Sequence, residues 1–233
     1  MGRMMPRTRP VVAIDGPVGA GKSTAARELA RALGFGYLNT GAMYRAVAVA
    51  ARGHGIDPDD PAAAARLAEI LESISITLEG ERVLLAGRDI SGEIAAPTIG
   101  DLASRLSALG VVRAKMRDLQ RAAGRDGGVV MEGRDIGTAV FPDAEIKFFL
   151  TADVKVRAER RYAELAAKGV AVTRAEVMAQ LIERDQRDRG RELAPLRRAA
   201  DAIEIDSTAL TVNEVVRAMK ARIDARACAP KRS

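Results

Sequence analysis

A glycine-rich run near the N-terminus carries the clearest chemistry in the sequence. Eight consecutive residues match the pattern G-x-x-x-x-G-K-[ST] at every fixed position: Gly16, Pro17, Val18, Gly19, Ala20, Gly21, Lys22 and Ser23. In this pattern backbone N–H groups surround a phosphate, the lysine reaches the β and γ phosphates, and the hydroxyl ligates Mg²⁺. A β-rich apolar run precedes the motif and a helical pattern follows it, as phosphate binding requires. A glycine-rich turn that matched the pattern by chance would not need these flanking elements. The motif predicts a nucleoside triphosphate site with Mg²⁺ and leaves the acceptor open.

A second polar segment, TGAMYR, follows the next short apolar run and includes Thr40 and Arg45. In a doubly wound sheet, the loops at the carboxyl ends of parallel strands line the ligand crevice. Arg45, one helical turn along, is then able to hold a second phosphate. The alternative is that Thr40 only caps a helix and Arg45 is a solvated surface charge. The segment alone leaves both interpretations open.

A third polar segment, Glu132-Gly133-Arg134-Asp135, follows the apolar run 129–131. A carboxylate at a strand end is well placed to polarise a water molecule on Mg²⁺, and this is the role we expect for Glu132. Arg134 and Asp135 would then face the same crevice. A simple polar turn explains Gly133 but not the clustering of an arginine with two acids, so we favour a functional interpretation.

Two helical patterns near the C-terminal end carry charges with helical spacing. On each helix these charges share a face. They are Arg157 and Arg161 on the first helix, and Arg184, Asp188 and Arg191 on the second. Charge runs of this kind are usually solvated faces. Joined by the short turn at Gly169, however, the two helices also describe a mobile flap that closes cations over a transferring phosphoryl group.

The elements needed to position these segments are those of a parallel α/β fold. Apolar runs predict buried strands at about 11–14, 37–40, 128–131, 145–150 and 202–205. Helical patterns lie between them, at about 22–33, 42–52, 99–123, 154–167, 173–188 and 212–226, with an Ala-rich helix ending near residue 73. Strand, glycine turn, helix, strand is the opening of a parallel α/β fold. Residues 74–90 alternate around Gly80, which predicts an antiparallel hairpin within an insertion.

The composition restricts the function classes. A chain of 233 residues with 48% hydrophobic residues predicts one sizeable domain and excludes a largely disordered chain. Its longest apolar runs are far shorter than the ~20 residues of a membrane span. Aromatic residues make up only 3%, which argues against a stacking platform for single-stranded nucleic acid. The chain has a single histidine, His54, which argues against histidine-centred catalysis.

The charge and the single cysteine add two further expectations. The net charge is +6 and the cationic residues are mostly arginine, which favours an anionic ligand. Charge balance alone does not choose between nucleic acid and a small phosphorylated molecule. Cys228 cannot form an internal disulfide or a cysteine-based metal cluster, so we expect a cytoplasmic protein.

Five blocks of the chain together resemble the bacterial cytidylate kinases. In order along residues 11–207 they are IDGPVGAGKST, YLNTGAMYR, SGEI, EGRDIGTAVFPDA and RDQRDRGRELAPL. The resemblance implies an α/β fold: a parallel-sheet P-loop NTPase core with helices on both faces, an NMP-binding insertion and a helical lid. It also implies transfer of the γ-phosphoryl group of ATP to CMP or dCMP, giving ADP and CDP or dCDP, in pyrimidine nucleotide metabolism.

The same resemblance implies a role for each matching position. Residues 16–24, which end at Thr24, would bind ATP, with Mg²⁺ held by Ser23 and, through water, by Glu132. The CMP phosphate would be surrounded by Thr40, Arg45 and Arg134. Ser104, Arg113 and Asp135 would read the cytosine edge, and Arg184 and Asp188 would contact the sugar. Lys22, Arg157, Arg161 and Arg191 would neutralise the phosphates during transfer.

These implications give the domain organisation and the partners that we expect. Residues 1–10 are predicted as a flexible basic arm, 11–226 as a single kinase domain and 227–233 as a tail. The NMP-binding insertion is placed at about 42–110 and the lid at about 154–191. We expect a monomer that binds ATP and CMP or dCMP, with Mg²⁺ as cofactor, and neither nucleic acid nor membrane.

Two positions depart from the family pattern, and two other functions stay open. Glu132 and Asn39 stand where the family usually has Asp. The longer Glu132 would shift a metal-bound water, and Asn39 removes a negative charge beside the loop. The alternatives are a P-loop kinase for another small acceptor, such as UMP or a non-nucleotide, and a nucleotide-gated regulator or nucleic-acid binder, which would bind DNA or RNA with steep salt dependence.

Overall fold

The computed structural model describes residues 7–227, which divide into two compact units. The first unit contains the described residues up to Tyr37, then Asp126–Gly190 and the chain from Ala194 onward. The second contains Leu38–Arg125 together with Arg191–Leu193. The predicted tail and Cys228, apart from residue 227, lie outside the described residues, as do residues 1–6 of the predicted arm.

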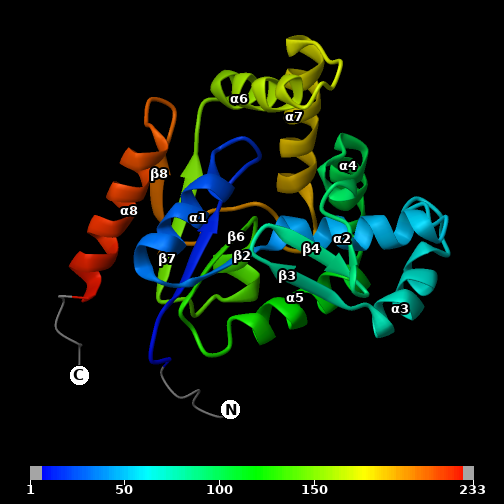
Figure 1. The fold of residues 1–233 in the computed structure, drawn as a ribbon, viewed down its shortest axis with the longest axis horizontal. Helices are drawn as coiled ribbons and strands as arrows, with labels where there is room; N and C mark the ends of the chain where they lie inside the picture. The colour runs from blue at the N-terminus through cyan, green and yellow to red at the C-terminus, as the bar shows by residue number, and fades with distance from the viewer. Residues whose placement is uncertain (1–6, 228–233) are drawn as a thin grey trace. The chain divides into compact units, whose positions relative to one another are not determined.

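A five-stranded sheet with the order β2-β6-β1-β7-β8 forms the centre of the first unit (Figure 1). Its strands are β1 (Val11–Asp15), β2 (Gly36–Asn39), β6 (Val129–Gly133), β7 (Ile146–Thr151) and β8 (Ile203–Asp206). β1 pairs in parallel with both β6 and β7, and β7 with β8. The predicted parallel α/β core is therefore confirmed. β1 is its central strand, and the glycine-rich motif follows the end of β1.

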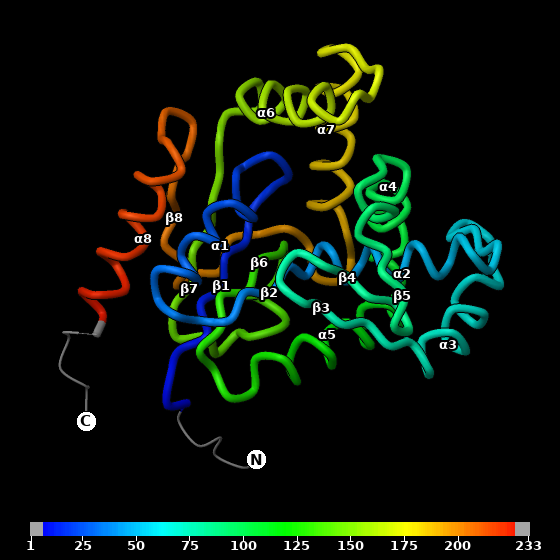
Figure 2. Tube along the Cα trace, viewed as in Figure 1, coloured from blue at the N-terminus to red at the C-terminus, as the bar shows by residue number. Residues whose placement is uncertain are grey.

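Helices α1 (Lys22–Leu33) and α8 (Val212–Ala227) pack side by side against the sheet (Figures 1 and 2). Val12 and Ile14 of β1 join them in one apolar cluster, while the alternate residues Val11 and Ala13 are also fully buried. Because successive side chains of a strand point to opposite faces, the sheet is covered on both faces, as the continuous apolar run predicts.

Two helices and a short turn complete the first unit. α6 (Val154–Ala167) and α7 (Arg174–Gly190) pack against each other as a helical hairpin around Gly169 (Figure 1). A single π-helical turn, η2 (Ile136–Val140), follows β6 and contacts β1. The hydrophobic pattern of the sequence gives no sign of this turn.

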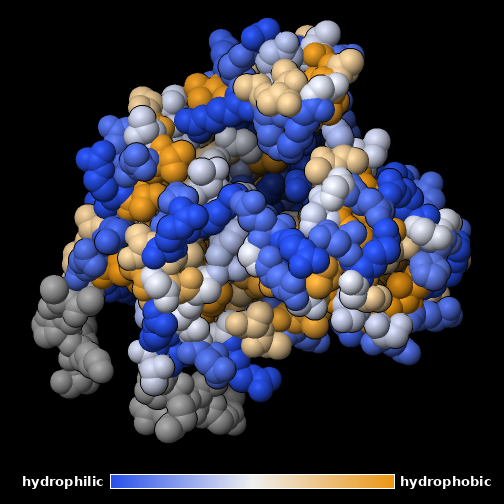
Figure 3. Space-filling view, viewed as in Figure 1, coloured by the Kyte–Doolittle hydropathy of each residue, from blue (hydrophilic) through white to orange (hydrophobic). Residues whose placement is uncertain are grey.

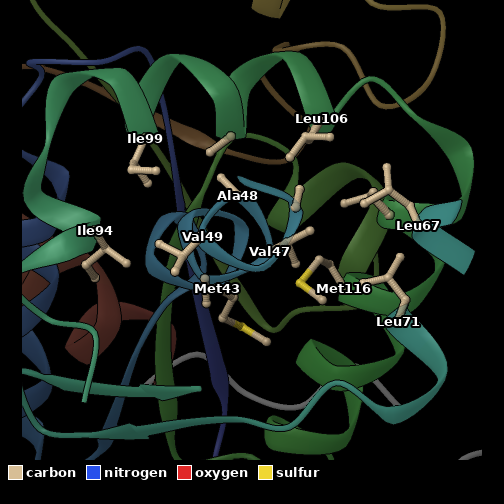
Figure 4. Packing of buried hydrophobic residues seen from close by; sticks show 14 of the residues in the cluster. Met43, Val47, Ala48, Val49, Leu67, Leu71, Ile94, Ile99, Leu106 and Met116 are labelled. Carbon is tan, nitrogen blue, oxygen red and sulfur yellow. The ribbon is translucent and has the colours of Figure 1, made fainter. Parts of the chain in front are cut away.

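The second unit has its own apolar core of helices and a small sheet. Its helices are α2 (Thr40–Gly53), α3 (Ala63–Ser73), α4 (Pro97–Leu106) and α5 (Gly110–Ala123), with a short 3-10 turn η1 (Glu93–Ala95). Val47 of α2 packs among Leu67, Leu106 and Met116 (Figure 4). The predicted hairpin is present as β3 (Ile76–Glu79) and β4 (Arg82–Leu85), and a third strand, β5 (Arg88–Asp89), extends it.

The structure corrects two expectations about the fold. The predicted helix at 99–123 is interrupted between α4 and α5, where Leu109 has an extended backbone. Arg7 and Arg9 are not part of a loose arm. Arg7 forms ion pairs with Asp143 and Glu145 at 2.8 and 3.0 Å, and Arg9 donates a hydrogen bond to the carbonyl oxygen of Gly34 at 2.6 Å.

Within residues 7–227, the structure contains no helix that combines the length and the apolar character needed to cross a membrane. On the face shown in Figure 3, hydrophilic residues predominate and hydrophobic ones are scattered among them. Single exposed apolar residues of this kind are normal on a protein surface.

Candidate active site

The glycine-rich motif joins the end of β1 to the start of α1, as its phosphate-binding role requires. Gly21 occupies the N-cap position with φ +85°, and the first turn of α1 contains no acidic side chain. Gly19 has φ +77°, and a Cβ atom there would lie 2.9 Å from the carbonyl oxygen of Arg157. The loop therefore needs its glycines, and it presents a helix N-terminus that suits an anion.

Lys22 is the first residue of α1, and it is almost fully buried. Its ammonium group donates a hydrogen bond to the carbonyl oxygen of Pro17 at 2.7 Å. Burial, reinforced by Arg134, lowers the pKa of Lys22 to about 7, although Glu132 and Asp15 act in the opposite direction. A phosphate beside Lys22 would favour the charged form and raise this pKa. The position thus suits a lysine that receives a polyanionic ligand.

Tyr37 links the motif to the carboxylate at the end of β6. Its hydroxyl donates a hydrogen bond to Oε1 of Glu132 at 2.9 Å, and it also hydrogen-bonds the side chain of Ser23. Burial, followed by the neighbouring Glu132, raises the pKa of Tyr37 well above its usual value. Ser23 and Glu132, predicted as a hydroxyl ligand and a water-mediated ligand, are therefore connected through one phenol. Sequence reasoning assigned Tyr37 no role.

The oxygen-rich group formed by Ser23, Tyr37 and Glu132 fits a hard divalent cation such as Mg²⁺. In the described part of the chain, no three His, Cys, Asp or Glu side chains come together in a way that could hold a metal ion. In general, a Mg²⁺ ion bound with substrate phosphates needs only one or two protein oxygens. Glu132 has the added reach of one methylene group over Asp, and its carboxylate ends at Tyr37.

Arg134 follows β6 and reaches the helical hairpin of the same unit. Its Nε donates a hydrogen bond to Oδ2 of Asp188 at 3.0 Å, and Asp188 is only 1% exposed. Arg184, one turn earlier on α7, is close enough to lower the pKa of Lys22. The structure therefore brings together Lys22, Arg134, Arg184 and Asp188, which come from three separate segments of the sequence. Asp135 is buried beside them, near enough to Asp15 to raise its pKa.

Arg157 and Arg161, predicted on one helical face, have different environments. Arg157 is buried, pairs with Asp185 at 2.8 Å, and donates hydrogen bonds to the carbonyl oxygens of Val18 and Ala152. Arg161 is partly exposed and pairs with Glu164 at 2.7 Å. The structure thus places Arg157 directly against the backbone of the phosphate loop, and Arg161 on the more open part of α6.

Helix α2 of the second unit begins at Thr40, which is buried, and carries Arg45 further along. Its cap is Asn39, whose side chain accepts a hydrogen bond from the N–H of Ala42 at 3.0 Å. The interpretation of Thr40 as the helix cap is therefore wrong. An asparagine caps a helix as well as an aspartate does, so the departure at Asn39 preserves the start of α2.

The other predicted residues of the second unit, Ser104, Arg113 and Arg191, lie near the break between α4 and α5. Arg113 donates a hydrogen bond to the carbonyl oxygen of Ser107 at 3.1 Å, and its guanidinium lies 5.9 Å from the ring centroid of Tyr44. Arg191 bonds the carbonyl and hydroxyl oxygens of Ser104, both at 3.4 Å. Tyr44 had no assigned role, although the TGAMYR block contains it.

The position of Arg191 differs from the prediction that it shares a helical face with Arg184 and Asp188. Helix α7 ends at Gly190, so Arg191 does not continue the helical face of Arg184 and Asp188. The chain from Arg191 to Leu193 belongs to the second unit instead. Helical spacing could not predict the contact of Arg191 with Ser104, because Arg191 lies beyond the end of α7.

Comparison with known proteins identifies the family. The model of the cytidylate kinase family matches residues 12–225. The chain belongs to the cytidylate kinase family. The cytidylate kinase of Citrifermentans bemidjiense is 50% identical over 218 residues, which cover 93% of both chains. The cytidylate kinases of Geobacter sulfurreducens and Methylococcus capsulatus are 51% and 50% identical, over 90% and 91% of this chain and 91% and 96% of theirs. This member of the cytidylate kinase family carries its glycine-rich motif between β1 and α1.

Proposed function

We infer that this protein transfers the γ-phosphoryl group of ATP to CMP or dCMP, giving ADP and CDP or dCDP in pyrimidine nucleotide metabolism. Membership of the cytidylate kinase family supports this activity. The structural observation that carries it is the phosphate loop between β1 and α1, with the buried Lys22 at the helix start.

We propose that residues 16–24 bind the phosphates of ATP and that Lys22 neutralises charge on the transferring group. In-line phosphoryl transfer requires mainly that two anions are positioned and their charge is stabilised. Lysine, arginines and Mg²⁺ satisfy this requirement without a histidine. Arg157 supports the loop through Val18, and Arg161 and Arg191 add positive charge toward the phosphates. Mg²⁺ supplies further charge neutralisation at the phosphates when it is bound. Ser23 and, through water, Glu132 would hold it.

We propose that Thr40, Arg45 and Arg134 bind the phosphate of CMP, and that Arg184 and Asp188 contact its sugar. Ser104, Arg113 and Asp135 read the base. Cytosine accepts hydrogen bonds at N3 and O2 and donates from N4, so an arginine, a hydroxyl and a carboxylate together distinguish it from uracil. The stacking of Arg113 on Tyr44 and its bond to Ser107 support this role, because they orient the guanidinium before substrate binds.

We also propose that the α6–α7 hairpin is the lid, that residues of about 42–110 form the NMP-binding insertion, and that the enzyme is a cytoplasmic monomer without a nucleic-acid partner. A closing lid excludes water from the transferring group. Limited proteolysis near Gly169 or Gly190 should change when ATP and CMP analogues bind together. Unchanged cleavage would argue against a mobile lid.

The activity is tested by incubating the purified protein with ATP, MgCl₂ and CMP and separating the nucleotides by anion-exchange chromatography. We expect ADP and CDP to form in equal amounts, and we expect neither with the Lys22→Ala variant. ADP without CDP would indicate ATP hydrolysis, and the absence of both products would contradict the proposed reaction. Replacing MgCl₂ with EDTA tests the metal requirement, and full activity in EDTA would contradict it.

A further inference from the structure

Asp15 is a buried carboxylate to which neither the motif nor the proposed reaction assigns a role. It is the last residue of β1, directly precedes Gly16 of the phosphate loop, and is 4% exposed. Its two oxygens accept hydrogen bonds from two successive backbone N–H groups, those of Ile136 and Gly137, both at 2.8 Å. Asp15 therefore joins the start of the phosphate loop to a segment more than a hundred residues later in the chain.

The two N–H groups belong to the turn that directly follows the proposed acceptor-binding residues Arg134 and Asp135. Ile136 and Gly137 open the π-helical turn η2, which directly follows Arg134 and Asp135. The carbonyl oxygen of Asp135 accepts hydrogen bonds from the N–H groups of Ala139 and Val140 at 2.8 and 3.2 Å, which closes the turn. Such π-turns are rare and concentrate at functional sites. Because the turn begins at the next residue, its position constrains the backbone at Arg134 and Asp135 and therefore the direction of their side chains.

Lys147 of β7 supports the same turn from another side. A Cβ atom at Gly137 would lie 3.0 Å from Cδ of Lys147 and 3.5 Å from Oδ2 of Asp15. Lys147 has little room to retreat, because its ammonium group donates to the carbonyl oxygen of Pro142 at 2.6 Å and pairs with Asp201 at 2.9 Å. The turn is thus held between the carboxylate of Asp15 and the aliphatic chain of Lys147.

We propose that Asp15 is a positioning residue for the acceptor nucleotide: its carboxylate fixes the turn η2, which directly follows Arg134 and Asp135, relative to the phosphate loop that begins at Gly16. The proposal rests on the proposed function for the roles of Arg134 and Asp135. Asp15 itself acts through the backbone, since its carboxylate accepts hydrogen bonds from the backbone N–H groups of Ile136 and Gly137.

The cost of burying this carboxylate supports a role beyond stability. Burial, with Asp135 nearby, raises the pKa of Asp15 to about 7, against the opposing effect of the two N–H groups and Lys22. A buried ionised group is unfavourable for folding unless it is well compensated. Asparagine has the same shape and no charge, so Asp15→Asn removes the burial cost of the charge. One of the two N–H groups then faces the amide NH₂ instead of an acceptor.

The Asp15→Asn variant separates positioning from folding. We expect the KM for CMP to rise about tenfold, because a small displacement of Arg134 and Asp135 strongly weakens CMP binding. The KM for ATP should change less than about twofold, since the phosphate loop keeps its own glycines and Lys22. The melting temperature should stay within about 4 °C of wild type, as expected for one lost hydrogen bond in a chain of this size. Amide exchange of residues 134–140 should accelerate in the absence of any nucleotide.

Two further variants make the test specific. Gly137→Ala adds a Cβ atom that crowds Lys147 and should displace the turn. It should therefore reproduce the rise in the KM for CMP with little effect on the KM for ATP. Asp206→Asn is the matched control, because Asp206 also ends a strand and accepts the N–H of Thr208 at 2.8 Å, but it is exposed. This control should leave both KM values unchanged.

The outcomes decide between the possible roles. Equal increases in the KM values for CMP and ATP would overturn the proposal, and so would unchanged kinetics with unchanged exchange at 134–140. The exchange measurement needs no turnover. If wild-type protein failed to phosphorylate CMP, the proposed function would fall, whereas unchanged exchange in Asp15→Asn would reject the contact itself.

Discussion

The phosphate-loop edge of the first unit and the α2–α4–α5 cluster of the second unit fix their proposed functional groups in different ways. At the phosphate-loop edge, strand ends and backbone groups dominate: Lys22 bonds a carbonyl oxygen, and Asp15 bonds two N–H groups. In the second unit, Arg113 lies over the Tyr44 ring and bonds the carbonyl oxygen that ends α4. The first arrangement depends on the course of the sheet, and the second on side chains at a helix break.

This difference suggests that the two regions contribute differently to phosphoryl transfer and to base recognition. Phosphoryl transfer is sensitive to small displacements, and a loop fixed by a central strand limits them. Base recognition requires a matched set of donors and acceptors, which side chains on helices supply and which substitution can alter. Changes to Lys22 and to Arg157, which contacts the phosphate loop, should therefore reduce kcat or the stability of the fold. Changes in the second unit should mainly raise the KM for CMP, as should Asp15→Asn, because Asp15 acts on the turn that follows Arg134 and Asp135.

The largest effect is expected from Lys22→Ala. Removing the buried ammonium group should lower kcat about 10³-fold or more, because charge on the transferring group then lacks the cation that we propose for its neutralisation. Circular dichroism should show an intact fold. The matched control is Lys168→Ala, an exposed lysine at the end of α6. Near-normal turnover in Lys22→Ala would remove the lysine from the transfer step.

A large stability effect is expected from Arg157→Met. The variant leaves Asp185, which is 6% exposed, without its guanidinium partner. Breaking a buried ion pair from one side should lower the free energy of unfolding by about 3 kcal/mol and the melting temperature by roughly 6–12 °C. Arg161→Met, on the same helix, should change the free energy of unfolding by less than about 0.5 kcal/mol. Equal melting temperatures for the two variants would show that the described burial of Arg157 is not maintained.

Arg113→Met tests the second unit. Methionine keeps most of the aliphatic contact but lacks the guanidinium, so the KM for CMP should rise about tenfold while kcat changes less than about threefold. The KM for ATP should stay unchanged. The ratio of kcat/KM for CMP to that for UMP should fall, and steady-state kinetics with both acceptors measure it. A fall in kcat with an unchanged KM for CMP would contradict the proposed division between the units.

The smallest effect is expected from Glu132→Asp. The shorter carboxylate loses its reach to Tyr37 but is the residue that the family pattern usually has there, so kcat should change less than about fivefold. The Mg²⁺ concentration for half-maximal rate should shift by about two- to threefold. Tyr37→Phe removes the same hydrogen bond and keeps the carboxylate length. A loss of most activity in Glu132→Asp would show that this chain depends on the longer side chain.

The sequence predicted most of the first unit because its signals are local. The phosphate-loop motif is contiguous, and α1 runs from Lys22 to Leu33 as predicted, with Gly34 directly after it. What could not be predicted there is the contact of Asp15 with Ile136 and Gly137, because pairing between distant segments leaves no local pattern. The docking of Arg7 on Asp143 and Glu145 was missed for the same reason.

The second unit was less predictable from residue patterns alone. The apolar periodicity continues through residues 107–109, so one long helix was predicted where the backbone turns between α4 and α5. Gly110 was the only local sign of this break. Ser104 and Arg113 were named through the family resemblance, and nothing in their spacing indicated the contact with Ser107 or Tyr44. Arg191 was placed on a helical face that ends one residue earlier.

The most direct test of the central claim is a parallel measurement of kcat/KM with ATP, Mg²⁺ and each of six acceptors: CMP, dCMP, UMP, AMP, GMP and shikimate. We predict strong turnover with CMP and dCMP and at least about tenfold lower kcat/KM with the other four. A clear preference for another acceptor would contradict the assignment of Ser104, Arg113 and Asp135 to cytosine recognition. Turnover of none of the six would contradict the kinase function itself.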